Sequence, residues 1–365
     1  MIVLENDCEI APCLVEDLIA DSAQEAILAA RSLGATRWAS LARGWSVAYL
    51  FGRLESIFAS GEEPVGAFTR ALDDLAEFFS FAAKSGFAAL GQEAGNDFDP
   101  PNNFGSVEGV TGDHYGRLFK EFSSSSYWDE PARLLSLRLT RNEVDLDSLK
   151  DKEVLDAGCG GGRYTVAWRL LGAKRAVGID VSRIGVEDAR RRVAEAGISG
   201  VEFEEGSVLE LPFRDESFDI VFSNGVLHHT VDWKAGIAEL VRVLRKGGLG
   251  WLYLIEKPGG LFWDSIEILR VIMKDERRDV ARGALQVLGI PANRIFYMLD
   301  HVLVPINIRL TPEEIEDCLA ESGATSIRRL TRGADFDRIE RIYQNDPYAD
   351  LKYGVGENRF VFSKD

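Results

Sequence analysis

A glycine-rich stretch directly after a short apolar run carries the residue types most suited to binding a cofactor. It reads Val154-Leu155-Asp156-Ala157-Gly158-Cys159-Gly160-Gly161-Gly162-Arg163. Because glycine has no Cβ, its backbone can adopt positive φ and pass close to a ligand. In a doubly wound α/β sheet such a turn opens at the carboxyl edge of the strands, where ligands bind. The stretch therefore predicts a nucleotide-type cofactor site.

Two other interpretations of this stretch have to be weighed. One is a nicotinamide dinucleotide site, but its GxGxxG fingerprint would need a third glycine where Arg163 stands. That site presents a helix N-terminus to a pyrophosphate, whereas Asp156 offers an anion to a ligand with an ammonium group. The second is a tight strand-to-helix turn without any ligand, which one glycine-rich stretch alone does not exclude.

Later segments repeat the pattern of an apolar run followed by small or polar residues. They are Ala176–Asp180, Gly206–Val208 with Leu211–Phe213, Ser217–Val221, Asn224–His229 and Val243–Gly248. In order and spacing they resemble the motifs of class I S-adenosylmethionine-dependent methyltransferases, in the broad group that includes the quinone-biosynthesis C-methyltransferases. The resemblance runs from about Glu153 to Ile255 and implies S-adenosylmethionine as the cofactor.

The resemblance also implies which residues hold that cofactor. They are Asp156, Gly158, Gly160, Gly162, Asp180, Val181, Ser207, Val208, Asn224, Gly225 and Tyr115. Asp180 would bind the ribose, because a carboxylate can accept two hydrogen bonds from a cis-diol, although an acid here can also simply cap the next helix. Ser207 stands where the family often has Asp, and a hydroxyl is the weaker acceptor. We therefore expect somewhat looser cofactor binding.

Three residues are candidates for catalysis. Methyl transfer from a sulfonium is an in-line displacement that depends on positioning, and an oxygen or nitrogen acceptor can also need a base. His229 follows the fourth strand, and Asp300 with His301 lies in the insertion 257–310, which is long enough to be a substrate lid. Equally, the paired histidines 228 and 229 can pack on the next helix, and Asp300–His301 can anchor the lid. No metal ligands are expected.

Strand-like and helical patterns divide the chain into parts. Residues 1–95 show helical periodicity, 96–112 form a Gly/Pro/Asn-rich linker, and 113–365 form the methyltransferase domain with its insertion. Alternating strands and helices predict a Rossmann-like, mostly parallel seven-stranded sheet, with 326–330 and 359–362 as an antiparallel edge pair. Thr311-Pro312-Glu313-Glu314 predicts a capped helix start. Tyr115, Phe119 and Tyr127 are possible walls of the ligand site, unless their segment is a solvated linker.

Composition limits the partners. The net charge of −17 repels phosphate backbones, so nucleic acid is not expected. No apolar run approaches the roughly 20 residues that span a bilayer, no signal peptide is expected from the acidic start, and the four scattered cysteines favour a reducing cytoplasm. The expected partner is a small molecule, with a homodimer also possible through the helical region.

These observations leave several functions open. The leading hypothesis is methylation of a small molecule at O, N or C. The alternatives are a protein or RNA methyltransferase recruited through the helical region, a cofactor-binding module without catalysis, and transfer of a group other than methyl. Against the macromolecular alternative, Asn224-Gly225-Val226-Leu227 stands where amino-nitrogen methyltransferases carry an Asn/Asp-Pro-Pro-aromatic motif. Fold and cofactor alone do not fix the chemistry.

Overall fold

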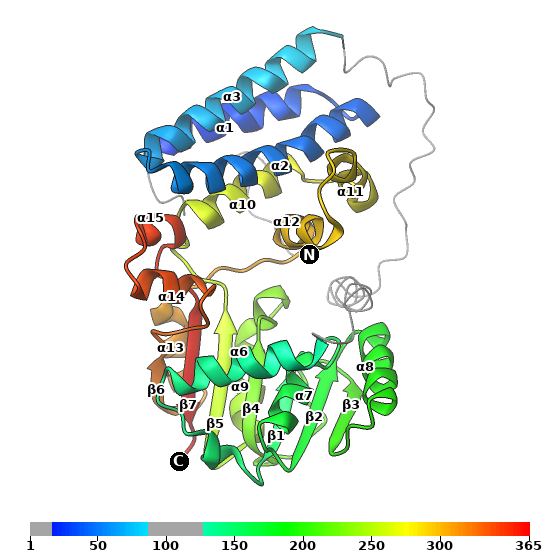
Figure 1. Ribbon diagram of the computed structural model, residues 1–365, viewed down its shortest axis with the longest axis vertical. Coiled ribbons are helices and arrows are strands. Elements are labelled where there is room, and N and C mark those ends of the chain that lie inside the picture. Colours follow the sequence, from blue (N-terminus) through cyan, green and yellow to red (C-terminus); the bar gives the residue numbers. More distant parts are fainter. Residues whose placement is uncertain (1–16, 87–126) are drawn as a thin grey trace. The chain divides into compact units, whose positions relative to one another are not determined.

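The structure is a computed structural model that describes residues 17–86 and 127–365 (Figure 1). Tyr115, Phe119 and the expected linker 96–112 lie outside the described residues. The chain divides into two compact units. The helical unit comprises Met1–Asn102, Pro258–Val304 and Asn345–Gly354, and the sheet unit comprises Asn103–Lys257, Pro305–Gln344 and Val355–Asp365.

The sheet unit contains one seven-stranded sheet in the order β3-β2-β1-β4-β5-β7-β6. The strands are β1 (Glu153–Ala157), β2 (Arg175–Asp180), β3 (Val201–Glu205), β4 (Phe218–Asn224), β5 (Leu244–Leu254), β6 (Thr325–Arg329) and β7 (Asn358–Ser363). Strands β1 to β5 are parallel, and β7 runs antiparallel to both β5 and β6. The predicted mostly parallel sheet with an antiparallel edge pair is therefore confirmed.

Helices surround this sheet because alternate strand residues point to opposite faces. They are α6 (Asp129–Thr140), α7 (Arg163–Leu170), α8 (Arg183–Glu195), α9 (Trp233–Val243), α13 (Pro312–Glu321) and α14 (Arg338–Tyr343), with the short turns η2 (Leu146–Leu149) and η3 (Leu227–His229). Val154 and Trp251 pack with residues of α6 and α7, whereas their neighbours Leu155 and Leu252 pack with residues of α9 and α13. Two apolar layers thus hold the strands whose ends form the site.

The predicted capping box at Thr311 is confirmed. The Thr311 hydroxyl accepts a hydrogen bond from the Glu314 N–H at 3.2 Å, and the Glu314 carboxylate accepts one from the Thr311 N–H at 2.7 Å. This reciprocal pair satisfies two backbone donors that the first turn of α13 would otherwise leave without partners.

The helical unit combines segments that are far apart in the sequence. It contains α1 (Asp17–Ser32), α2 (Arg37–Ser60), α3 (Pro64–Lys84), α10 (Gly260–Ile272), α11 (Arg278–Val287), α12 (Ala292–Leu303) and α15 (Ala349–Tyr353). A Cβ on Gly44 of α2 would lie 2.8 Å from the Ala284 Cβ of α11, so these helices cross closely. Trp45 of α2 donates its indole N–H to the Ala284 carbonyl at 3.2 Å.

This grouping differs from the domain boundaries expected from the sequence. The insertion 257–310 was expected as a lid on the methyltransferase domain, but most of it belongs to the same compact unit as the N-terminal helices. The physical reason is burial, because α10 places apolar side chains on all of its faces, and they need partners. Among the described helices, none is both long and apolar enough to cross a membrane.

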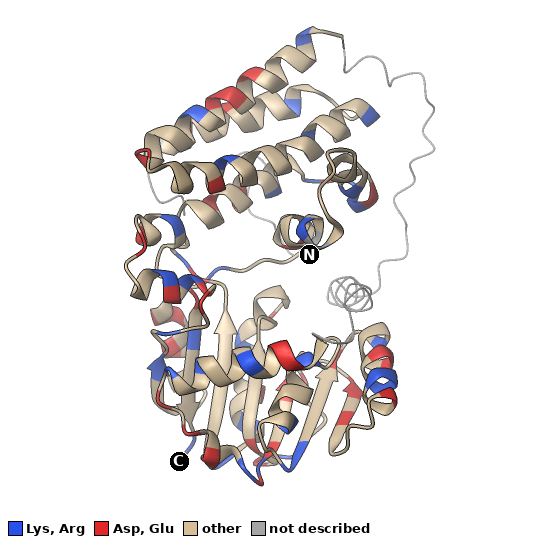
Figure 2. Ribbon diagram, viewed as in Figure 1, with Lys and Arg blue, Asp and Glu red and all other residues tan. Residues whose placement is uncertain are grey.

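Acidic and basic side chains alternate along α8 rather than forming a basic stripe (Figure 2). Arg191 pairs with both Asp188 and Glu195, and Arg183 pairs with Glu187, each at helical spacing. The exposed pairs Arg191–Glu195 and Arg183–Glu187 contribute little to stability. A phosphate backbone needs clustered cations, so α8 does not provide such a surface.

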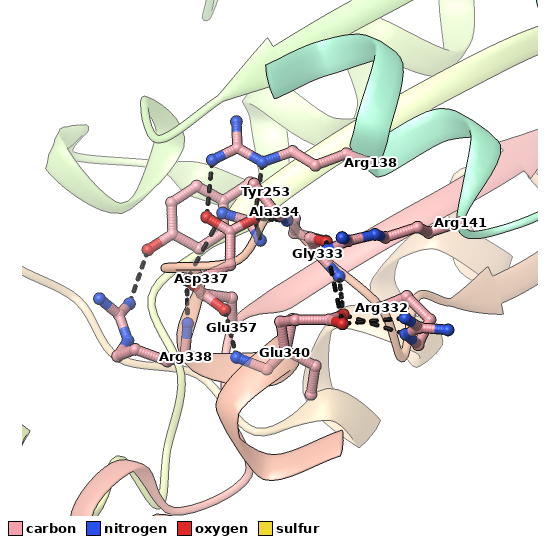
Figure 3. Close-up of polar contacts among 12 residues, drawn as sticks. Arg138, Arg141, Tyr253, Arg332, Gly333, Ala334, Asp337, Arg338, Glu340 and Glu357 are labelled. Atoms are coloured by element: carbon pink, nitrogen blue, oxygen red, sulfur yellow. Dashed lines mark hydrogen bonds and ion pairs between the residues drawn. The ribbon is translucent and has the colours of Figure 1, made fainter. Parts of the chain in front are cut away.

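A buried ion network ties the last part of the sheet unit to α6 (Figure 3). Arg138 of α6 donates two hydrogen bonds of 2.7 Å to the two carboxylate oxygens of Asp337. Arg359 of β7 and the Ala334 N–H donate to the same carboxylate, at 2.9 and 2.7 Å. All three charged side chains are almost fully buried. The two arginines hold the pKa of Asp337 well below its ordinary value, against the effect of burial.

We expect Asp337→Ala to lower the free energy of unfolding by about 3–5 kcal/mol, because it removes the carboxylate that pairs with the buried Arg138 and leaves the buried Arg359 only its longer contact to Glu357. Urea denaturation followed by circular dichroism measures this loss. The matched control is Glu202→Ala, which breaks the exposed Arg175–Glu202 pair and should cost no more than about 1 kcal/mol. Equal losses in the two variants would contradict a structural role for the buried network.

Candidate functional site

The glycine stretch forms a loop between β1 and α7 that only glycine can adopt. Gly158, Gly160 and Gly162 have φ values of +87°, +52° and +75°, which lie in the left-handed region. A Cβ on Gly158 would lie 2.3 Å from the Val226 side chain, and a Cβ on Gly162 would lie 2.4 Å from the Phe203 ring. The loop therefore needs glycine both for its backbone conformation and for its close packing.

Asp180, at the end of β2, joins the glycine loop to the start of α8. Its Oδ2 accepts a hydrogen bond from the Gly160 N–H at 2.7 Å, and its Oδ1 accepts one from the Ser182 N–H at 2.8 Å. Ser182 itself caps α8. Burial raises the pKa of Asp180, and the two backbone N–H groups partly oppose this. Each carboxylate oxygen still has an unused lone pair, so the geometry suits a vicinal diol.

Asp156, at the end of β1, is a second buried acid beside the loop. Its Oδ2 accepts a hydrogen bond from the Thr165 hydroxyl of α7 at 2.6 Å. Burial raises the pKa of Asp156 to about 7, the Thr165 hydroxyl opposes this, and the charge of Asp180 adds to it. A carboxyl group held near its neutral form becomes ionised when a cation is placed beside it. Asp156 and Asp180 thus fit the ammonium and ribose groups of S-adenosylmethionine.

The loops after β3 and β4 meet the same edge of the sheet. The Gly206 N–H donates to the Asp180 carbonyl at 3.0 Å, which brings the Ser207 loop beside β2. The Ser207 hydroxyl accepts from the Leu209 N–H at 3.1 Å. The side chain of Val208 is buried in the core below.

After β4, Gly225 has a φ of +84° and donates its N–H to the Tyr253 carbonyl at 3.1 Å. The Asn224 side chain accepts a hydrogen bond of 3.4 Å from the Trp251 indole. The half-buried Val181 directly follows Asp180. The structure thus brings the sequence-predicted residues to one edge of the sheet, except Tyr115, which lies outside the described residues.

The two histidines of η3 are buried, and their ring centroids lie 4.2 Å apart. The Nδ1 atom of His229 lies 2.7 Å from the Ile306 carbonyl oxygen. Because a carbonyl only accepts hydrogen bonds, this nitrogen carries the proton, and Nε2 is then the basic atom. The Ile308 N–H also donates to the His228 carbonyl at 2.9 Å. Sequence reasoning missed Ile306, since a backbone carbonyl leaves no signal in side-chain types.

Asp300 and His301 lie on α12 in the helical unit. The His301 Nε2 atom is 3.9 Å from an Asp300 carboxylate oxygen. The His301 ring packs against Trp263 with centroids 4.8 Å apart, and Arg270 donates to the His301 carbonyl at 2.7 Å. These contacts all lie within the insertion itself, so the anchoring role and the catalytic role of the pair both stay predictions.

Tyr253 of β5 is a further residue at this edge that sequence reasoning missed. Its hydroxyl accepts a hydrogen bond of 3.0 Å from Arg338 (Figure 3). Arg338 also donates to Glu256 at 2.8 Å. Its ring atoms would lie 3.6 Å from a Cβ on Gly225. Burial raises the pKa of Tyr253, so the phenol stays neutral. The sequence signal that could have pointed to this part of the sheet was Glu256. Like Asp156 and Asp180, it is an acid at the end of an apolar strand.

Comparison with known proteins identifies the family of this chain. Residues 155–252 match the family described as a methyltransferase domain. The chain is 31% identical over 198 residues to 27-O-demethylrifamycin SV methyltransferase of Amycolatopsis mediterranei. These aligned residues cover 52% of this chain and 70% of that protein.

Two other relatives match over shorter stretches. O-methyltransferase cnsE of Penicillium expansum is 30% identical over 154 residues, which cover 40% of this chain and 56% of that protein. The phthiotriol/phenolphthiotriol dimycocerosates methyltransferase of Mycobacterium tuberculosis is 35% identical over 123 residues, which cover 33% of this chain and 43% of that protein. The chain thus spans about half the length of these two. With its glycine loop and paired acids, the chain belongs to the class I S-adenosylmethionine-dependent methyltransferases.

Proposed function

We propose that this methyltransferase methylates a hydroxyl oxygen of a small-molecule acceptor, with His229 as the base. The observation that carries the proposal is the hydrogen bond between His229 and the Ile306 carbonyl at 2.7 Å. It orients the imidazole and assigns its proton to Nδ1, so that Nε2 can take a proton from the acceptor. A backbone carbonyl here takes the place of the carboxylate that orients the base in many nucleophilic sites.

S-adenosylmethionine supplies an electrophilic methyl group on a sulfonium, which leaves as a neutral thioether. The glycine loop and the acids Asp156 and Asp180 would bind its amino-acid and ribose parts, and Ser207, Val208 and Asn224 would line the rest of the site. His229 would take the acceptor's hydroxyl proton while the new oxygen–carbon bond forms. The proton ends on Nε2 and passes to solvent after the product leaves. Holding the acceptor in line with the methyl group supplies most of the rate.

The relatives support a small-molecule acceptor with a reactive oxygen. Two of them are named for O-methylation, one on a rifamycin and one without a stated acceptor, and the third acts on phthiotriol lipids. The net charge of −17 argues against RNA as the acceptor. A macromolecular acceptor recruited by the helical unit and a cofactor-binding module without catalysis remain the alternatives. Asp300–His301 is the competing candidate for the base.

Cofactor affinity should depend on the ionisation of Asp156. Its pKa of about 7 means that acid neutralises the carboxylate, so we expect binding of S-adenosylhomocysteine to weaken by roughly tenfold as the pH falls from about 8 to about 6. Asp156→Asn should weaken binding at pH 8 and remove most of this pH dependence. Isothermal titration calorimetry measures both effects. The surface variant Glu195→Gln should behave as wild type, and a full pH dependence in Asp156→Asn would exclude this role.

Asp156→Asn should also change the stability of the protein in a pH-dependent way. The folded-state pKa of Asp156 lies above its ordinary value of 3.8, so its contribution to stability is complete below about pH 4 and is lost as the pH rises through about 7. Asn has no charge to bury. The cofactor-free Asp156→Asn variant should therefore melt at a higher temperature than wild type at pH 8 but not at pH 4.

His229→Ala should lower turnover by roughly 10²–10⁴-fold, because a positioned base typically contributes that much. Binding of S-adenosylhomocysteine should stay within a few fold of wild type, which shows that the site is intact. His301→Ala is the parallel variant and should keep most of its turnover. If His301→Ala loses activity and His229→Ala does not, the base is the Asp300–His301 pair instead.

The acceptor class can be tested without knowing the acceptor. The protein would be incubated with methyl-labelled S-adenosylmethionine and an extract of its source organism, which is then separated into small molecules and macromolecules. We expect label in a small molecule, stable to mild base hydrolysis as an ether is. Label in protein or RNA would overturn the small-molecule acceptor, and carbon- or nitrogen-bound label would overturn the oxygen acceptor.

A further inference from the structure

Tyr127, just before α6, touches the glycine loop. Its side chain is fully buried, and its hydroxyl donates a hydrogen bond of 2.7 Å to the Gly161 carbonyl, itself in a buried residue. Burial raises the pKa of Tyr127 well above its ordinary value, so the phenol keeps its proton. The hydroxyl therefore stabilises the loop. The ring is fully buried, so it does not form an exposed wall of the site.

The ring of Tyr127 makes a second contact, to α8. The Arg192 guanidinium lies over the ring, 4.3 Å from its centroid. Arg192 in turn donates to the buried Asp188 at 2.8 Å, also on α8. A guanidinium over an aromatic face is attracted by the ring quadrupole, and the ion pair fixes its place on the helix. Tyr127 is therefore bonded to the loop through its hydroxyl and to α8 through its ring.

The loop and α8 also meet directly at the cofactor site. A Cβ on Gly185 of α8 would lie 2.8 Å from the Gly160 carbonyl, so the two backbones are in close contact. Asp180 bonds the Gly160 N–H on one side and the Ser182 N–H at the start of α8 on the other. Any change in the distance between loop and helix thus changes the surroundings of the Asp180 carboxylate.

We propose that Tyr127 is a positioning residue for the cofactor, which holds the glycine loop against α8 without contacting the ligand. Its hydroxyl fixes the Gly161 peptide, and its ring fixes the neighbouring turn of α8. Tyr127→Phe keeps the ring on Arg192 but leaves the buried Gly161 carbonyl without this hydrogen bond. An unsatisfied buried carbonyl is costly, so the loop shifts until this carbonyl finds another partner. The shift disturbs the hydrogen bond between the Gly160 N–H and the Asp180 carboxylate.

The test measures S-adenosylhomocysteine affinity by calorimetry for wild type, Tyr127→Phe and a matched control. The control is Tyr164→Phe on α7, which also loses a tyrosine hydroxyl, one that accepts a 2.6 Å hydrogen bond from Arg138. We expect Tyr127→Phe to raise the Kd by about tenfold, which corresponds to roughly 1.4 kcal/mol, and Tyr164→Phe to change it by less than twofold. Melting temperatures report how much general stability each variant loses.

Equal affinity in Tyr127→Phe and wild type would overturn the proposal, as would equal weakening in both tyrosine variants, because either result assigns Tyr127 to general stability. If Tyr127→Phe does not fold, Arg192→Gln replaces it, since this variant keeps the hydroxyl and removes the cation from the ring. Unchanged affinity there would also overturn the proposal. The assay uses no acceptor, so its outcome is separate from the question of whether the enzyme methylates an oxygen with His229 as the base.

Discussion

The close approach of the glycine loop to its neighbours is the constraint on which the cofactor site depends. The loop after β1 lies against Val226, Phe203 and α8 at distances that a single Cβ would prevent. This packing brings the Gly160 N–H to the Asp180 carboxylate. The two acids are therefore held in a buried place where their ionised forms are disfavoured. Packing and electrostatics act together, since the burial that packs the loop also raises the pKa of Asp156 and Asp180.

The acceptor side of the site rests on hydrogen bonds between segments distant in sequence. Residues 306 and 308, near the end of the insertion, bond to the η3 turn, and the end of β5 is tied through Arg338 to the segment before β7. Opposite charges in contact, with Arg138 and Arg359 around Asp337, make the buried polar network tolerable. Such networks contribute less to stability than apolar packing of equal volume, but they hold irregular backbone in one place.

The sequence predicted the sheet, which the structure confirms, and a set of candidate cofactor residues, because both depend on local patterns. An apolar run followed by an acid, as at Asp156 and Asp180, indicates a strand that ends at the ligand edge of the sheet, and the glycines after Asp156 indicate a tight turn. The capping box at Thr311 is equally local. What the sequence could not supply was the grouping of residues 258–304 with the N-terminal helices, because an apolar helix such as α10 shows that it needs a partner and not which one.

For this protein, then, the sequence by itself determined the family and the parallel core of the sheet, and it singled out Asp156 and Asp180 as candidate cofactor residues. Only the tertiary structure decided that His229 is oriented by the Ile306 carbonyl. It also decided that Tyr127 is buried and donates a hydrogen bond to the Gly161 carbonyl. Finally, it brought Arg138 to Asp337, which is 199 residues further along the chain. The physical reason is that backbone carbonyls and long-range ion pairs carry no periodic signal. They form only after apolar packing has brought distant segments together.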